Sequence, residues 1–188
     1  MSAPAAAWVD EVRRLDLACY EAIAKTSTPA LDGALARLSR AADRSKLSLA
    51  AAGGLALFGG SPGRRAAILG LGSVAVTSAV VNVAVKPLAR RRRPDRGAYE
   101  VPVARQVTMP TSRSFPSGHS AAAFAFAGGA GRGMPAVSMP LHGLAGLVAY
   151  SRVHTGVHYP LDALTGSVLG AALAQISSHW VERRLSAR

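Results

Sequence analysis

Residues 66–85 read AAILGLGSVAVTSAVVNVAV, a stretch without a charged residue in which Asn82 is the only strongly polar side chain. A helix rises about 1.5 Å per residue, so a helix of this length is about 30 Å long and matches the hydrocarbon core of a bilayer. The stretch therefore predicts a transmembrane helix over about 66–86, and it directs the fold assignment toward a membrane protein.

Other uncharged stretches flank this one, at residues 47–62, 114–131, 133–151 and 163–180 with histidine counted as neutral. Some are short and all are rich in Ala and Gly, so they suit a bundle in which small residues allow close helix approach. Gly166 and Gly170 have the four-residue spacing of such contacts. We expect an all-α integral membrane helical bundle with about five transmembrane helices, at about 46–60, 66–86, 117–131, 134–151 and 161–181.

Short polar segments connect these helices. The sequence predicts a turn at Ser61–Arg65, a long basic loop over residues 87–116 and a last loop over 153–160. With five spans, the long loop, the start of the third membrane helix and the last loop all lie on one side of the membrane. Side chains from these three segments are therefore expected to converge.

The first 46 residues are more polar than the rest of the chain. Residues 7–25 and 29–46 each place apolar side chains on one face and charges on the other, which predicts two amphipathic helices at the membrane interface. Trp8 and Tyr20 suit the depth of the lipid headgroups. The alternative is a short helical hairpin packed on the flank of the bundle. We divide the chain into an N-terminal interfacial segment, 1–46, and a transmembrane domain, 47–188.

The charge balance is strongly basic. Of 188 residues, 22 are Lys or Arg and 10 are Asp or Glu, and the net charge is +12. This balance alone would fit a non-enzymatic protein that binds anionic membranes or nucleic acid, but such a function would leave the histidine motifs described below unexplained. Cys19 is the only cysteine, which excludes an intramolecular disulfide and a cysteine-based zinc cluster.

The last loop carries the residues of a histidine nucleophile. With its flanking residues this loop reads SRVHTGVHYPLD over residues 151–162, and Pro160 predicts the start of the next helix. Asp162 then lies in the first helical turn, four residues after His158. A carboxylate there can hydrogen-bond one imidazole nitrogen and leave the other as an exposed lone pair. The alternative is a structural capping pair. We assign His154, in the same loop, to the rim of a pocket.

Pro116-Ser117-Gly118-His119 opens another predicted helix. Free N–H groups at a helix start favour an anion, and Gly118 allows it to approach the backbone closely. Ser117 adds a hydroxyl donor, and His119 can protonate a leaving group as a general acid. The alternative for Ser117 is an ordinary helix cap.

Three cations complete the set, because Lys86, Arg93 and Arg152 lie in the converging segments. Cations of this kind neutralise the oxygens of a phosphoryl group in the transition state. We assign the neighbouring run Arg90–Arg92 to solvent or lipid headgroups, and only Arg93 of this run to the site.

Together the three segments resemble the type-2 phosphatidic acid phosphatase superfamily, membrane lipid-phosphate phosphatases that share a fold core with vanadium haloperoxidases. The first family motif is Lys, six residues, Arg-Pro, and it is matched by Lys86 and Arg93-Pro94. The second, Pro-Ser-Gly-His, is matched by Pro116–His119. The third is Ser-Arg, five residues, His, three residues, Asp, and it is matched by Ser151-Arg152, His158 and Asp162. Residues 38–46 also resemble the segment before the first span of actinobacterial relatives.

The resemblance implies a reaction without a metal ion or other cofactor. His158 would attack phosphorus to form a phosphohistidine, and Asp162 would orient it. His119 would protonate the leaving group and then activate water. The resemblance assigns phosphate binding to Lys86, Arg93, Ser117, Gly118 and Arg152.

The implied function is a membrane lipid-phosphate phosphatase whose partners are the bilayer and a lipid phosphate, and not nucleic acid. The substrate class stays open between a polyprenyl phosphate or diphosphate, a polyprenyl phosphosugar phosphate, phosphatidylglycerophosphate and phosphatidic acid. A vanadate-dependent haloperoxidase is the enzymatic alternative, which the membrane spans disfavour.

The expected location is the cell membrane, with several spans. Family analogy places the active site outside the cytoplasm. The distribution of charge opposes this, because 16 of the 22 Lys and Arg lie on the active-site side if the N-terminal helices do, and positive residues favour the cytoplasm. Some of the 16 are recruited for phosphate binding, so we favour the outward-facing site.

Overall fold

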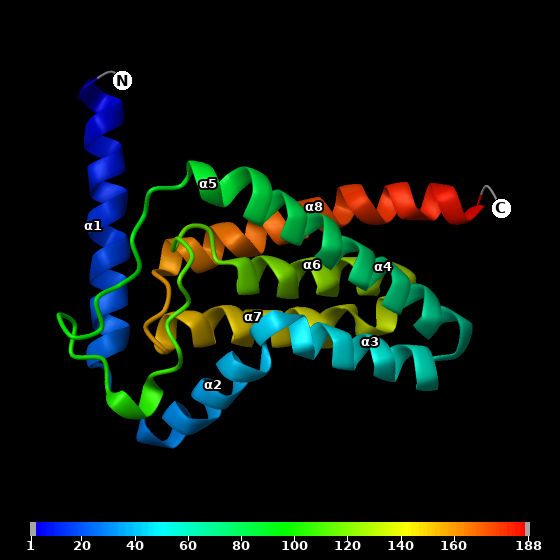
Figure 1. Ribbon diagram of the computed structural model, residues 1–188, viewed down its shortest axis with the longest axis horizontal. Helices are drawn as coiled ribbons and strands as arrows, with labels where there is room; N and C mark the ends of the chain where they lie inside the picture. Colours follow the sequence, from blue (N-terminus) through cyan, green and yellow to red (C-terminus); the bar gives the residue numbers. More distant parts are fainter. Residues whose placement is uncertain (1–2, 187–188) are drawn as a thin grey trace.

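The computed structural model describes residues 3–186, and all regular elements in this range are helical (Figure 1). The predicted all-α class is therefore confirmed. In chain order the elements are α1 (Ala3–Lys25), α2 (Pro29–Ala41), η1 (Asp43–Ser45), α3 (Lys46–Phe58), α4 (Gly60–Ala79), η2 (Val80–Val85), α5 (Lys86–Leu88), η3 (Val103–Arg105), α6 (Gly118–Gly133), η4 (Pro135–Val137), α7 (Ser138–His154) and α8 (Pro160–Ser186).

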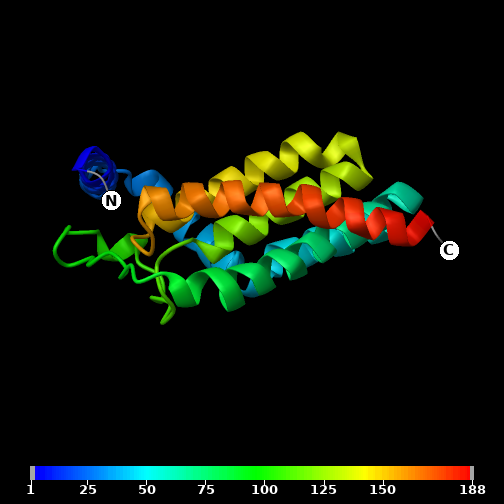
Figure 2. The ribbon, with the colours of Figure 1, turned by 90° about the horizontal axis from the view of Figure 1, so that it is seen from above.

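The five stretches predicted to span the membrane are all helices, and they form an elongated bundle (Figures 1 and 2). Helix α6 lies at its centre and packs against α4, α7 and α8. Segments α4, η2 and α5 form one continuous helix, Gly60–Leu88. Within residues 3–186, this is the one helix long and apolar enough to cross a membrane by itself. The count of five spans therefore stays a prediction.

The turn between the first two bundle helices lies earlier than predicted. The chain reverses at Gly59–Gly60, where Gly60 has φ +60°, and Ser61–Arg65 belong to the first turns of α4. The prediction of a turn at Ser61–Arg65 was wrong because Pro62 is tolerated in the first helical turn, where its missing N–H has no helical partner to lose. Glycine supplies the left-handed residue that the reversal requires.

Helix α8 lies unusually close to α6. A Cβ at Gly166 or Gly170 would overlap the backbone carbonyl oxygen of Ser117 or Ala121, respectively. The two glycines therefore let the helix backbones touch, as their spacing suggested. This contact fixes the start of α6, which carries one of the predicted catalytic histidines, against the start of α8.

We expect Gly170→Ala to lower the stability of the bundle by about 1–3 kcal/mol, because the added methyl group overpacks a backbone contact. Gly146→Ala on α7 is the matched control, since a Cβ there meets no atom within 4 Å. It should be neutral or stabilise the helix slightly. Thermal unfolding of the purified proteins in detergent measures both effects, and equal melting temperatures of the two variants would contradict the close packing.

The N-terminal helices pack on one end of the bundle. Helix α1 stands across the bundle axis (Figure 1), and α2 packs against α7. Trp8 is 73% exposed, but Tyr20 is 1% exposed and contacts the rings of Tyr99 and Tyr159 at centroid distances of 5.1 and 5.2 Å. Tyr20 therefore packs inside the protein and does not face the lipid headgroups, because the long loop folds over that face of α1. Its depth relative to the membrane stays a prediction.

A buried charge cluster fixes this loop. Arg105 of η3 donates to Asp32 Oδ1 of α2 over 2.9 Å and to the carbonyl oxygen of Ile23 over 3.0 Å. His154 Nε2 lies 3.0 Å from the same Asp32 oxygen. His154 is thus the buried last residue of α7, and its assignment to a pocket rim was wrong. Because removing one partner of a buried ion pair is strongly destabilising, the cluster holds α2, the loop and α7 together.

Candidate active site

The predicted site residues meet at one end of the bundle. The long α4–α5 helix carries Lys86 in its last turn, and Arg93 lies in the loop after it. His119 lies in the first turn of α6, Arg152 in the last turn of α7, and His158 between α7 and α8. This end is opposite to the C-terminus (Figure 1). The convergence expected from helix parity is therefore observed.

His158 has the environment of a neutral nucleophile. It is 1% exposed, and its Nε2 lies 3.1 Å from Arg93 Nη1. A guanidinium only donates hydrogen bonds, so Nε2 must carry the lone pair. Burial lowers the pKa of His158 to about 4, although Asp162 opposes this shift. The imidazole is thus uncharged at neutral pH, with its nucleophilic atom beside a cation that can hold a phosphate oxygen.

Asp162 stands behind this ring. Its Oδ2 lies 3.6 Å from His158 Nδ1, and it accepts hydrogen bonds from the Tyr159 N–H over 3.0 Å and from Ser114 Oγ over 2.5 Å. Arg91 Nη1 donates to Oδ1 over 3.0 Å. Asp162 therefore caps the turn that starts α8, which is the structural alternative considered for it. Its carboxylate also lies beside the imidazole, and its role in orienting that ring stays a prediction.

Arg91 and Ser114 are two site residues that the sequence reasoning missed. Arg91 links Asp162 to Asp16 of α1, and its guanidinium lies 4.0 Å from the centre of the Tyr159 ring. Its assignment to solvent or lipid headgroups was wrong. The chain is extended after α5, so every second arginine faces the protein. Arg91 and Arg93 are partly buried, whereas Arg90 and Arg92 are exposed. In an extended segment alternate side chains point to opposite sides, and this pattern could have distinguished Arg91 from Arg90 and Arg92.

Asp43 is a third missed residue. Its Oδ1 lies 2.9 Å from His119 Nε2 and 3.4 Å from Arg152 Nη1. It comes from η1, between α2 and α3, so the N-terminal segment contributes a carboxylate to the candidate general acid. None of the three motifs contains it, and its partners are 76 and 109 residues away in the sequence. The resemblance of residues 38–46 to actinobacterial relatives was the signal that could have pointed to it.

The phosphate-binding candidates surround these groups. Arg152 is buried and donates to the Ser39 carbonyl oxygen over 3.0 Å, while its Nε has no hydrogen-bond partner among the described residues. Buried polar atoms are rarely left unpaired, so Nε is a donor suited to a phosphate oxygen. Lys86 Nζ reaches Ser112 Oγ over 3.3 Å, and a Cβ at Gly118 would lie 3.4 Å from it. Gly118 therefore leaves room beside the ammonium at the start of α6.

Ser117 is the N-cap of α6, as the structural alternative for it predicted. Its Oγ accepts hydrogen bonds from the N–H and the hydroxyl of Ser120 over 3.4 and 2.9 Å. The residue is fully buried. A donor role of its hydroxyl toward phosphate stays a prediction.

A neutral imidazole nitrogen, a second histidine held by a carboxylate, three cations and a helix start together suit phosphoryl transfer. The family model of the PAP2 superfamily matches residues 67–186 of this chain. The chain belongs to the PAP2 superfamily. It is 37% identical over 134 residues to the decaprenylphosphoryl-5-phosphoribose phosphatase of Mycobacterium tuberculosis, and the match covers 69% of this chain and 68% of that relative.

Solved structures show the same fold. LpxE of Aquifex aeolicus superposes with a TM-score of 0.70 and 25% identity, covering 87% of this chain and 94% of LpxE. The transmembrane PAP2-type phosphatidylglycerolphosphate phosphatase of Bacillus subtilis gives a TM-score of 0.69 and 24% identity, covering 92% and 87%. This PAP2 member is a membrane lipid-phosphate phosphatase, as the three motifs predicted.

We expect Asp43→Asn to lower kcat about 10-fold or more, because the amide no longer stabilises the protonated form of His119 and general acid catalysis contributes roughly 10²–10⁴-fold. Asp10→Asn, on the exposed face of α1, is the matched control. Steady-state phosphate release measures both. If Asp43→Asn kept the wild-type kcat, Asp43 would not assist His119 in catalysis. A rise in KM alone would instead indicate that Asp43 positions Arg152 for phosphate binding.

Proposed function

We propose that this protein removes the terminal phosphate from a polyprenyl phosphosugar phosphate through a phosphohistidine on His158. The observation that carries the chemistry is the buried, neutral His158, with Nε2 beside Arg93 and Asp162 behind its Nδ1. The printed activity of the mycobacterial relative supports a sugar phosphate on a polyprenyl carrier among the candidate substrates.

In this mechanism His158 Nε2 attacks phosphorus, and the bond to the substrate oxygen breaks. The leaving alkoxide takes a proton from His119, which gives the free sugar hydroxyl. Asp162 stabilises the positive charge of the phosphorylated imidazole. Water then attacks phosphorus while His119 takes its proton, so inorganic phosphate leaves and His158 is restored. Arg93, Lys86 and Arg152 hold the charge of the phosphoryl oxygens in both steps.

The arrangement of the helices supports a site at the membrane surface. If the five bundle helices cross the bilayer, α1 lies across the bundle axis and therefore in the plane of the headgroups (Figure 1). The exposed Trp8 suits that depth. A lipid tail can then remain in the bilayer while its phosphate enters the site. We place this end of the bundle outside the cytoplasm.

His158→Ala should abolish phosphate release, because it removes the proposed nucleophile. The loss should be at least about 10⁴-fold, on the scale seen when a catalytic nucleophile is removed. His142→Ala is the control, since His142 lies in α7 outside this cluster. The wild-type activity should survive EDTA. Complete loss of activity with the chelator would overturn the metal-independent mechanism.

The proposed orientation predicts that a reporter enzyme fused to the C-terminus is active in the cytoplasm. Five spans would place the C-terminus on the side opposite to the active site. The same reporter inserted at Gly97, in the exposed long loop, should behave as extracytoplasmic. A reversed pattern would place the active site in the cytoplasm. Matching signals from both positions would contradict the odd number of spans proposed between Gly97 and the C-terminus.

A further inference from the structure

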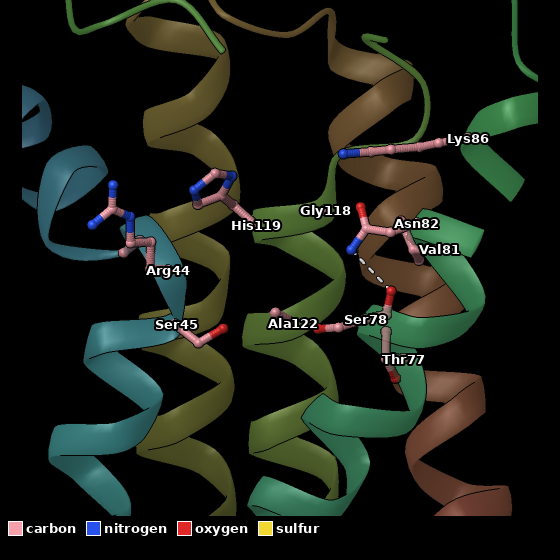
Figure 3. Close-up of a pocket in the computed structure, with 11 residues that line it drawn as sticks. Arg44, Ser45, Thr77, Ser78, Val81, Asn82, Lys86, Gly118, His119 and Ala122 are labelled. Carbon is pink, nitrogen blue, oxygen red and sulfur yellow. Dashed lines mark hydrogen bonds between the residues drawn. The ribbon is translucent and has the colours of Figure 1, made fainter. Parts of the chain in front are cut away.

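A pocket of about 170 Å³ adjoins the candidate phosphate site at Lys86, Gly118 and His119. It lies between η1, which connects α2 to α3, on one side and α4 and η2 on the other, and the start of α6 lines it as well (Figure 3). Lys86 and His119 stand at its mouth and also belong to the catalytic cluster. The catalytic mechanism above leaves the rest of this pocket without a role.

One wall is polar, although within residues 3–186 it belongs to the one helix long and apolar enough to cross a membrane by itself. Thr77, Ser78 and Asn82 line it. The Asn82 side-chain amide donates to the Ser78 carbonyl oxygen over 2.9 Å, and its own oxygen points away from that bond, toward the mouth (Figure 3). Asn82 lies in the π-helical segment η2, and such segments occur frequently at functional sites.

Thr77 of the same wall has an unpaired hydroxyl group. It is fully buried, and its Oγ1 has no hydrogen-bond partner among the described residues. A buried hydroxyl in this state is rare in native structures. The wall therefore offers a hydroxyl and an amide oxygen to a polar group inside the pocket.

The opposite wall carries a cation. Arg44 lines the pocket and has neither an ion pair nor a hydrogen bond within residues 3–186. Arg44 and Ser45 both have left-handed backbones, with φ +54° and +57°. Two adjacent non-glycine residues in this region are unfavourable, and such strain tends to occur at functional sites. The neighbouring Asp43 is already paired with His119 and Arg152, so Arg44 is left to face a different anion.

From these features we infer that the pocket binds the part of the substrate between the scissile phosphate and the lipid tail. This inference rests on the proposed function and narrows its substrate. The ligand chemistry is a terminal phosphomonoester joined through a hydroxylated spacer to a second, phosphodiester group. The spacer contacts Thr77, Ser78 and Asn82, and the phosphodiester pairs with Arg44, since a guanidinium matches phosphate oxygens closely.

The pocket's size and polarity support this assignment. Its volume is well below the roughly 300–1,000 Å³ of a typical drug-sized ligand site, so it suits a small polar group and not a lipid tail. A site that hydrogen-bonds a substrate hydroxyl discriminates strongly against analogues that lack it. The pocket therefore makes the enzyme select against a plain lipid monophosphate.

A pentose and a glycerol could each supply the hydroxylated spacer, and the experiment separates them. Phosphate release is measured for a short-chain prenyl phosphodiester of ribose 5-phosphate, for phosphatidylglycerophosphate and for a prenyl monophosphate of the same chain length. The preference is the ratio of kcat/KM for a spacer-containing substrate to kcat/KM for the plain monophosphate. The wild type should prefer at least one spacer substrate about 10-fold or more, and the larger ratio identifies the spacer.

Arg44→Gln and Thr77→Val should each lower that ratio about 10-fold. Arg40→Gln, on the exposed face of α2, is the matched control and should leave the ratio unchanged. Arg44 is exposed, so Arg44→Gln should fold, and its melting temperature verifies this. An unchanged ratio in a folded Arg44→Gln protein, or a wild type without a preference, would overturn the pocket assignment alone. Absence of phosphate release from all three substrates would instead overturn the proposed function.

Discussion

Asp162 is a fully buried carboxylate, and much of the active site depends on the way its charge is compensated. An unpaired buried charge is costly by several kcal/mol, so it must be surrounded by donors. The Tyr159 N–H, Ser114 and Arg91 provide them, and they come from the start of α8 and from the long loop. Arg91 in turn binds Asp16 of α1. One carboxylate thus ties the nucleophile, the loop and the N-terminal helix together.

The second constraint is the contact between α6 and α8. Gly166 and Gly170 let these helices touch along their backbones, and the Ser117 N–H donates to the Asp162 carbonyl oxygen over 2.9 Å. The start of the helix that carries His119 is therefore fixed to the start of the helix that carries Asp162. Catalytic geometry has to be held within a fraction of an ångström. Backbone contact between the two helices is stiffer than contact through long side chains.

The helix pattern and the three motifs could be predicted because they are local in the sequence. Uncharged stretches marked all five bundle helices, and His158 and Asp162 are separated by one helical turn. Apart from the turn that was placed at Ser61–Arg65, the failures were at residues whose partners are distant. Arg91, Tyr20 and His154 look like ordinary loop or interface residues until the long loop folds over α1 and α2. Asp43 lies outside the three motifs, and only the packing of η1 against α6 brings it to His119.

The sequence by itself determined the helical class, the family motifs and the convergence of their residues at one end, since periodicity, spacing and helix parity are properties of the chain. Only the tertiary structure decided which arginine pairs with Asp162, which carboxylate reaches His119, and where unpaired polar groups line a pocket. These depend on contacts between segments far apart in the sequence. The charge and polarity of Arg44, Thr77 and Asn82 are properties of the sequence, but their common pocket arises only when η1, the α4–η2 helix and α6 pack together.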